Sequence, residues 1–166
     1  MNVRLSAAAV SYALGMVAVS ALGQSAAPQP VQWTVAVEPK KQVSAGEGIT
    51  LHLAAPIDPG WHVYALNEPS GGPIPLRIAL DNAEIAQIDG AISGTTPKTQ
   101  HDESFQSDTS YYEGHFELRV PVKLARVHSG EQALPLSVRF QACSSRTCLP
   151  PRTVHLPVSV EVIPGA

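Results

Sequence analysis

Residues 134–162 read LPLSVRFQACSSRTCLPPRTVHLPVSVEV and contain the only two cysteines of the chain, Cys143 and Cys148. Apolar side chains occupy alternate positions on both sides of the pair: Leu134, Leu136, Val138, Phe140 and Ala142 before it, and Val154, Leu156, Val158, Val160 and Val162 after it. Runs with a period of two indicate strands with one buried face. The short connection between the runs predicts a hairpin or a tight corner, with the cysteines at its mouth.

The two cysteines are close enough in the sequence to form a disulfide. A disulfide requires Cα atoms about 4.4–6.8 Å apart, and residues at the two ends of a short loop can reach that distance. Closing so small a loop stabilises a protein by only about 2 kcal/mol through the lost entropy of the unfolded chain. Two interpretations therefore stay open: the cysteines form a structural staple, or they form a redox pair exposed at a loop.

The first residues have the pattern of a secretory signal peptide. Arg4 precedes a short apolar stretch over residues 7–22, and small residues lead to Gly23. We expect this segment, residues 1–23, to direct export and to be removed near Gly23; an uncleaved membrane anchor is the alternative, although the segment is weakly hydrophobic for a permanent span. We expect residues 24–30 to form a disordered tail. Residues 31–166 are long enough to form one domain.

Charge and residue types argue against several classes of function. The chain has 11 Lys and Arg against 14 Asp and Glu, a net charge of −3, and removing Arg4 with the signal segment makes it −4. A mildly acidic chain without a basic run is a poor partner for nucleic acid or for an anionic membrane surface. Two cysteines with scattered histidines lack the usual ligand set of a zinc site, so we expect no metal. No hydrolase signature occurs.

Thiol chemistry is the class of function that remains. In an exported protein, two neighbouring cysteines become oxidised unless a reductant is supplied. The spacing Cys143-x4-Cys148, in a chain without a β-α-β pattern, does not fit a thioredoxin-type site. Arg146 between the cysteines would favour a thiolate, whereas Asp102 and Glu103 would oppose it if they fold over the pair. A solvated loop charge is the simpler interpretation of Arg146.

Short alternating runs elsewhere predict an all-β chain. Strands are expected at residues 31–37, 49–55, 61–64, 76–80, 83–88 and 116–124. Ile49, Leu51 and Leu53 should face inward, and Pro121 should face out at a sheet edge. Residues 89–111 are polar and predict a long loop without regular structure, a feature that is often functional. Short strands separated by turn residues favour an antiparallel β-sandwich of the immunoglobulin type.

Three motifs in a fixed order resemble those of a known family, the N-terminal periplasmic domain of the thiol:disulfide interchange protein DsbD. They are the redox segment Cys143-x4-Cys148 with Leu149-Pro150-Pro151, the aromatic strand and loop Gly60-Trp61-His62-Val63-Tyr64 with Gly71-Gly72-Pro73-Ile74-Pro75, and the cap loop His101-Asp102-Glu103-Ser104-Phe105. The resemblance covers residues 31–162, and three motifs in order are more specific than any one of them.

The resemblance implies an immunoglobulin-like domain with a long cap loop over its cysteine pair. Such a domain takes electrons from a membrane-embedded reductase and gives them to thioredoxin-fold proteins of the periplasm, without a metal or an organic cofactor. Cys148 would exchange with partners, Cys143 would resolve the mixed disulfide, and Phe105 would shield the pair. The other residues expected to line the site are His62, Tyr64, Asp102, Glu103 and Arg146. Plain core packing stays open for the aromatic residues Trp61 and Tyr64.

Two departures from the family affect the expected role. Well-known members have one more residue between the cysteines, and the full interchange protein continues into membrane helices and a thioredoxin-like domain, whereas this sequence ends at Ala166. Either a separate membrane-embedded or thioredoxin-like donor would then supply electrons, or the domain has lost that role. The leading hypothesis is an exported thiol–disulfide exchange domain, a protein-disulfide reductase component that acts through Cys143 and Cys148. The alternative is a non-catalytic binding module or adaptor with a structural loop disulfide.

Overall fold

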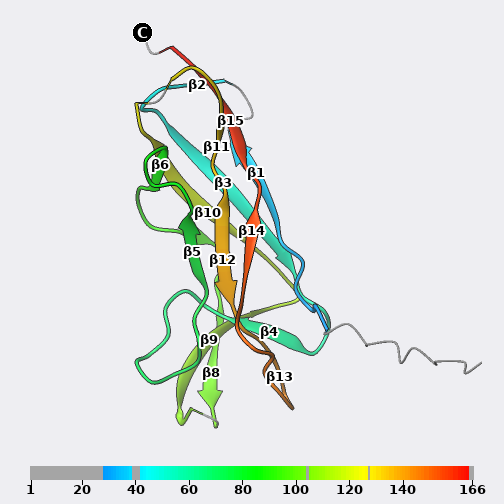
Figure 1. Ribbon diagram of the computed structural model, residues 1–166. Coiled ribbons are helices and arrows are strands. Elements are labelled where there is room, and N and C mark those ends of the chain that lie inside the picture. The colour runs from blue at the N-terminus through cyan, green and yellow to red at the C-terminus, as the bar shows by residue number, and fades with distance from the viewer. Residues whose placement is uncertain (1–27, 39–41, 104, 127, 165–166) are drawn as a thin grey trace, which may run out of the picture.

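The computed structural model describes residues 28–38, 42–103, 105–126 and 128–164. Within these ranges all regular structure consists of β-strands, drawn as arrows in Figure 1. The same ranges contain no helix with the length and apolar character needed to cross a membrane. The predicted signal peptide and most of the predicted tail, residues 1–27, lie outside the described residues.

The largest sheet has the strand order β1-β3-β10-β6, and β7 also pairs with β10. Its strands are β1 (Thr34–Glu38), β3 (Gly48–Pro56), β6 (Ala86–Ile88), β7 (Ser93–Gly94) and β10 (His115–Leu124). β3 and β10 pair antiparallel along almost their whole lengths, and both alternate apolar and polar side chains. Ile49, Leu51 and Leu53 are buried on this sheet, as the alternation predicted.

Three smaller sheets complete the molecule. The sheet β14-β12-β5 contains β5 (Arg77–Leu80), β12 (Leu136–Phe140) and β14 (Arg152–Leu156). The sheet β11-β15-β2 contains β2 (Val43–Ser44), β11 (Gly130–Ala133) and β15 (Ser159–Ile163). The sheet β13-β4-β9-β8, at the lower end of the molecule in Figure 1, contains β4 (Trp61–Tyr64), β8 (Lys98–Asp102), β9 (Ser107–Glu113) and β13 (Ala142–Ser144).

The inner faces of these sheets share one hydrophobic core, which confirms the predicted all-β, immunoglobulin-like sandwich. Aromatic rings join its layers. The Trp33 ring packs 5.7 Å from Phe116 on β10 and 5.1 Å from Phe140 on β12. Tyr112 on β9 stacks on Phe116 at 4.2 Å. Phe116 therefore links the largest sheet to the small sheet that carries β13.

The prediction that Pro121 lies on an edge strand is wrong. β10 is a central strand, with β3 on one side and β6 and β7 on the other. The Pro121 carbonyl accepts the Asp89 amide at 2.9 Å, so the Pro121 nitrogen also faces the side of β6 and β7. β6 pairs with residues 122–124 and β7 with residues 118–119, which leaves Pro121 opposite neither strand. A proline is tolerated there because no ladder hydrogen bond needs its missing N–H.

The prediction of a structureless insert over residues 89–111 is also wrong. The segment contains β7, β8 and most of β9, and β8 and β9 form a hairpin with five paired positions. β8 is exposed at four of its five positions, so neither of its faces carries the apolar residues that would produce an alternation in the sequence. The strand predicted over residues 83–88 is shortened to β6, because the Ile85 and Ala86 amides donate to the Asn82 carbonyl in a turn (both 3.3 Å).

We expect Phe116→Ala to be strongly destabilising, because Phe116 is only 1% exposed and contacts both Trp33 and Tyr112. Truncating a buried phenylalanine typically costs about 3–5 kcal/mol of unfolding free energy. Urea unfolding followed by tryptophan fluorescence measures the change. The matched control is His115→Ala at the exposed neighbouring position, and similar losses for both variants would contradict a core role for Phe116.

A polar cluster on the outer face of the β14-β12-β5 sheet joins three residues. The Ser137 hydroxyl and His155 Nδ1 (2.8 Å) both contact the Asp81 carboxylate. Ser137 Oγ and the Asp81 carboxylate both contact Nδ1 of His155. In a catalytic triad the serine and the aspartate contact different nitrogens of the histidine, so this cluster is not a triad. The hydrogen bond from Ser137, and then the contact with His155, hold the pKa of Asp81 below its usual value of 3.8.

The lowered pKa of Asp81 predicts a pH-dependent effect of Ser137→Ala. A carboxylate whose pKa falls on folding stabilises the fold above its unfolded pKa, and this contribution disappears as the pH falls through the folded pKa. Ser137→Ala should therefore reduce stability at neutral pH, and the difference from the natural chain should shrink below 3.8. Urea midpoints across this range measure it, with the exposed Ser159→Ala as control; a pH-independent difference would contradict the assignment.

Candidate functional site

A hairpin loop carries the two cysteines. Cys143 and Cys148 form a disulfide, with Cα atoms 4.0 Å apart, and they face each other as an isolated antiparallel bridge. The loop is closed by the Ser144 amide, which donates to the Thr147 carbonyl at 2.8 Å, and by the Thr147 amide, which donates to Ser144 Oγ at 3.2 Å. The predicted position of the cysteines at the mouth of a turn is confirmed.

The pairing register of the hairpin changes by one residue between the strands β12 and β14 and the cysteine loop. β12 and β14 pair as far as Phe140 and Arg152. Pairing resumes where the Leu149 amide donates to the Ala142 carbonyl at 2.9 Å. Between these points the outgoing chain has one residue, and the returning chain has two prolines. Such a β-bulge bends a strand and increases its twist, and here it accompanies the passage of the chain from β12 to β13 in another sheet.

The register of β13 on β4 decides which side chains surround the pair. Cys143 lies opposite His62, His62 lies opposite Glu113, and Tyr64 lies opposite Tyr111. Residues directly opposite one another on antiparallel strands project from the same face. We call the face formed by Cys143, His62, Tyr64, Tyr111 and Glu113 the cysteine face. The opposite face belongs to the core, and its residues are Val63, Tyr112 and Ala142.

The two cysteines differ in their access to solvent. Cys143 is 1% exposed and belongs to the buried residues. Cys148 is exposed, as are residues 145–147 of the loop. The two sulfurs are therefore chemically inequivalent, because a reagent in solution reaches Cys148 and not Cys143.

The tip of the β8–β9 hairpin lies against Tyr64. The Tyr64 hydroxyl donates to Asp102 Oδ2 at 2.9 Å, and the Phe105 ring meets the Tyr64 ring edge-on at 6.1 Å. Tyr64 is 3% exposed although it lies on the face that points away from the core. These contacts bring together three residues that the sequence assigned to the site.

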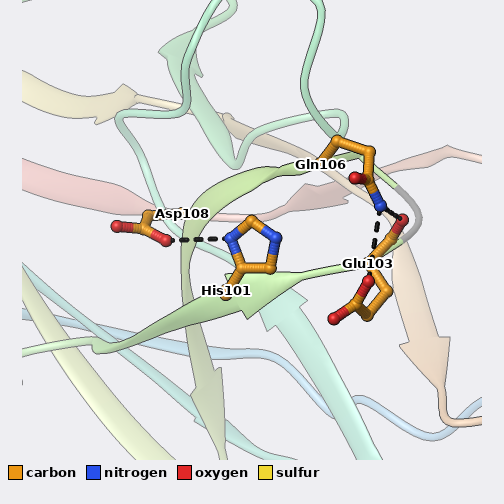
Figure 2. A network of polar contacts seen from close by, with 4 residues as sticks. All are labelled: His101, Glu103, Gln106 and Asp108. Carbon is orange, nitrogen blue, oxygen red and sulfur yellow. Dashed lines mark hydrogen bonds and ion pairs between the residues drawn. The ribbon is translucent and has the colours of Figure 1, made fainter.

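Figure 2 shows the loop of the same hairpin and the ends of the two strands that lead into it. His101 Nδ1 and an Asp108 carboxylate oxygen lie 3.2 Å apart across the two strands. Gln106 donates to the Glu103 carbonyl at 2.6 Å and holds the loop closed, with a φ of 50° that few non-glycine residues adopt. Glu103 is exposed and bonds to Gln106, not to Tyr64. Arg146 is exposed at the loop of the other hairpin.

A solvent-open groove of about 650 Å³ borders the cysteine face, and sequence reasoning missed most of it. Its lining includes Trp61, His62, Lys98, Tyr111, Glu113 and Ser145 of the cysteine loop. Lys98 pairs with Glu113, and Tyr111 donates to Gln100 Oε1 at 3.0 Å. The sequence carries little signal for this surface, because residues 107–110 are all polar and no alternation marks which of them share a face with Tyr111.

Burial shapes the protonation of the cysteine face. Burial lowers the pKa of His62 from 6.5, and the negative charges of Asp102 and Glu113 oppose this shift. Burial, followed by the hydrogen bond to Asp102, raises the pKa of Tyr64, so its phenol stays a proton donor at neutral pH. Burial also raises the pKa of Glu68, whose carboxylate accepts the Ser110 amide of β9 at 3.1 Å.

Several solved structures are similar to this chain. The structure resembles the reduced DsbD N-terminal domain of Neisseria meningitidis, with 18% identity, coverage of 72% of this chain and 80% of that chain, and a TM-score of 0.48. It also resembles the N-terminal periplasmic domain of ScsB from Proteus mirabilis, with 16% identity, coverage of 79% and 45%, and a TM-score of 0.47.

A third similar structure is the complex between the DsbD and PilB N-terminal domains of Neisseria meningitidis, with 16% identity, coverage of 75% and 80%, and a TM-score of 0.44. None of the curated proteins matches the chain. Residues 27–159 match the family described as "Thiol:disulfide interchange protein DsbD, N-terminal". The match spans most of the sequence and includes both cysteines, the aromatic strand and the β8–β9 hairpin, so the chain belongs to the family of DsbD N-terminal domains.

Proposed function

We propose that this domain is an exported carrier of reducing equivalents that exchanges disulfides with thioredoxin-fold proteins of the periplasm. The observation that carries the proposal is the inequivalent pair, an exposed Cys148 bonded to a buried Cys143, in a chain of the DsbD N-terminal family. An exposed sulfur can meet a partner, and a buried neighbour can release that partner afterwards. A separate membrane-embedded or thioredoxin-like protein would reduce the pair again.

The exchange conserves two electrons and two protons. The Cys148 thiolate attacks the partner's disulfide, a mixed disulfide forms, and one partner sulfur leaves as a thiolate. Cys143 then loses its proton and attacks Cys148 Sγ, which re-forms the Cys143–Cys148 bond and expels the second partner sulfur. The two thiol protons of the domain end on the two sulfurs of the partner, which is thereby reduced.

We further propose that Phe105 limits how closely a partner disulfide can approach the exposed Cys148. Phe105 sits at the tip of the β8–β9 hairpin and packs on Tyr64, whose strand pairs with the strand of Cys143. Opening the tip would break this aromatic contact, which lies next to the hydrogen bond that the Tyr64 hydroxyl donates to Asp102. The hairpin would then act as a cap that slows oxidation by unspecific disulfides.

Trapping tests the carrier role. In Cys143→Ala the mixed disulfide cannot be resolved, so mixing the reduced variant with an oxidised thioredoxin-fold protein should accumulate a covalent complex through Cys148. Non-reducing electrophoresis and mass spectrometry identify the linkage. Cys148→Ala is the matched control and should trap little, because Cys143 is buried. Absence of a Cys148-linked complex would contradict the carrier and favour an inert disulfide in a binding module.

Replacing Phe105 tests the cap. An aromatic pair contributes about 0.5–1.5 kcal/mol, so Phe105→Ala should speed the reaction of the reduced pair with dipyridyl disulfide by about twofold to tenfold. The absorbance of released thiopyridone measures the rate. Phe105→Leu keeps an apolar side chain and should fall between the natural chain and the alanine variant. Equal rates in all three proteins would show that Phe105 does not control access.

A further inference from the structure

The resolving step of the proposed function poses a proton-transfer problem. A thiolate and not a thiol is the nucleophile, and an ordinary cysteine has a pKa of about 8.5. Cys143 is 1% exposed and lies among buried residues, an environment that favours the neutral thiol once the disulfide is reduced. Water cannot reach this thiol readily, so a protein group close to Cys143 has to accept its proton.

His62 is the group that the strand register brings to Cys143. The two residues are directly opposite each other on β4 and β13. Side chains in such positions share a face, with Cβ atoms about 4.5–5.5 Å apart. The His62 ring is held between two tyrosines, edge-on to Tyr64 at 5.1 Å and tilted against Tyr111 at 5.2 Å. The imidazole is therefore held on the cysteine face by contacts on two strands.

The charged groups around His62 suit a base that is neutral before the reaction. Burial lowers its pKa from 6.5, which leaves the ring uncharged at neutral pH with a free lone pair. Asp102 on β8 and Glu113 on β9 face the ring and would stabilise an imidazolium after the proton arrives. Lys98 on β8 is paired with Glu113, which limits its repulsion of that cation.

The remaining polar neighbours fit this assignment. Tyr64 is itself a donor, since its hydroxyl gives its hydrogen to Asp102 and burial raises its pKa. Tyr111 gives its hydrogen to Gln100. Asp58, in the turn before β4, lines the groove together with His62. The solvent-open groove gives the ring a second side from which water can remove the proton, so His62 connects buried Cys143 with solvent.

We propose that His62 is the general base that accepts the Cys143 proton when Cys143 attacks the mixed disulfide at Cys148. The inference rests on the proposed function. The Cys143 S–H bond breaks and its proton moves to the imidazole, the Cys143–Cys148 bond forms, and the partner sulfur leaves with the electron pair of the broken mixed disulfide. The imidazolium then gives its proton to the departing thiolate or to groove water. When a donor reduces the domain, the same imidazolium protonates the departing Cys143 thiolate.

One equivalent of dipyridyl disulfide separates the two steps without any partner protein. The reduced domain should release thiopyridone in two phases, first by attack of exposed Cys148 and then by the closure of Cys143 on Cys148. His62→Gln should leave the first phase within about twofold and slow the second by about a hundredfold near pH 7, the lower end of what a positioned base contributes. His155→Gln, on a different sheet, is the matched control and should change neither phase.

The pH profile separates a base from a structural role. With His62 present, the second phase should be nearly level from about pH 7 to about pH 8.5, between the pKa values of an imidazole and a thiol. In His62→Gln it should rise about tenfold per pH unit, since only the spontaneously ionised thiol reacts. A slowing that is equal at every pH, or no slowing, would overturn the proposal.

The natural chain alone tests the inference if the variant does not fold. A second phase that rises tenfold per unit through neutral pH in the natural chain would mean that no base assists Cys143, and the proposal would fall. The reagent takes the partner's place, so this result is independent of trapping. A second phase that is level with pH, together with failed trapping, would support His62 as the base and contradict the carrier role. A second phase that rises with pH, together with successful trapping, would support the carrier role and contradict His62 as the base.

Discussion

The backbone pairing of β13 with β4 is the constraint on which the surroundings of the disulfide depend. Three register pairs join these strands, and one of them sets Cys143 opposite His62. Because side chains alternate between faces, a shift by one residue would move Cys143 to the core side and place Ala142 or Ser144, depending on its direction, opposite the histidine. The side chains of the site share one face because this short ladder fixes the register of the two strands.

The rest of the fold supports that ladder from two directions. From one side, β12 and β14 carry the cysteine loop, anchored by the buried Leu136 and Val138. From the other side, Tyr112 stacks on Phe116 and joins the small sheet to the central strand β10. The core thus fixes the inner face of the small sheet, and its outer face is left to polar groups. Exposed loops on a rigid scaffold are the usual location of binding and chemistry.

Sequence reasoning found the parts of this structure that bury apolar side chains. The alternation around Leu51 and Val138 predicted strands, since a half-buried strand has to place its apolar residues at every second position. The same method failed for residues 89–111, where the hairpin strands are polar on both the edge and the outer face. It also failed for Pro121, whose tolerance depends on a gap between two neighbouring strands that the sequence does not show.

Only part of the candidate site could be predicted from the sequence. Motif resemblance singled out Tyr64, Asp102 and Phe105, and the structure places their side chains in contact. It did not indicate Tyr111 or Lys98, because their nearness to His62 arises from pairing between segments far apart in the sequence. Pairing register also depends on the partner strand and on turn geometry, which the periodicity of a single strand does not show.

The β-bulge, in which Gln141 lies opposite two prolines, limits where the chain length can change during evolution. Residues added or lost within 145–147 change only the size of an exposed turn, because β13 ends at Ser144 and the ladder is already closed by the Ala142 and Leu149 pair. A residue inserted at Gln141 would instead turn every later side chain of β13 to the other face and remove Cys143 from His62. Natural variation in length should therefore be confined to the segment between the sulfurs, and the bulge should tolerate substitutions but neither insertions nor deletions.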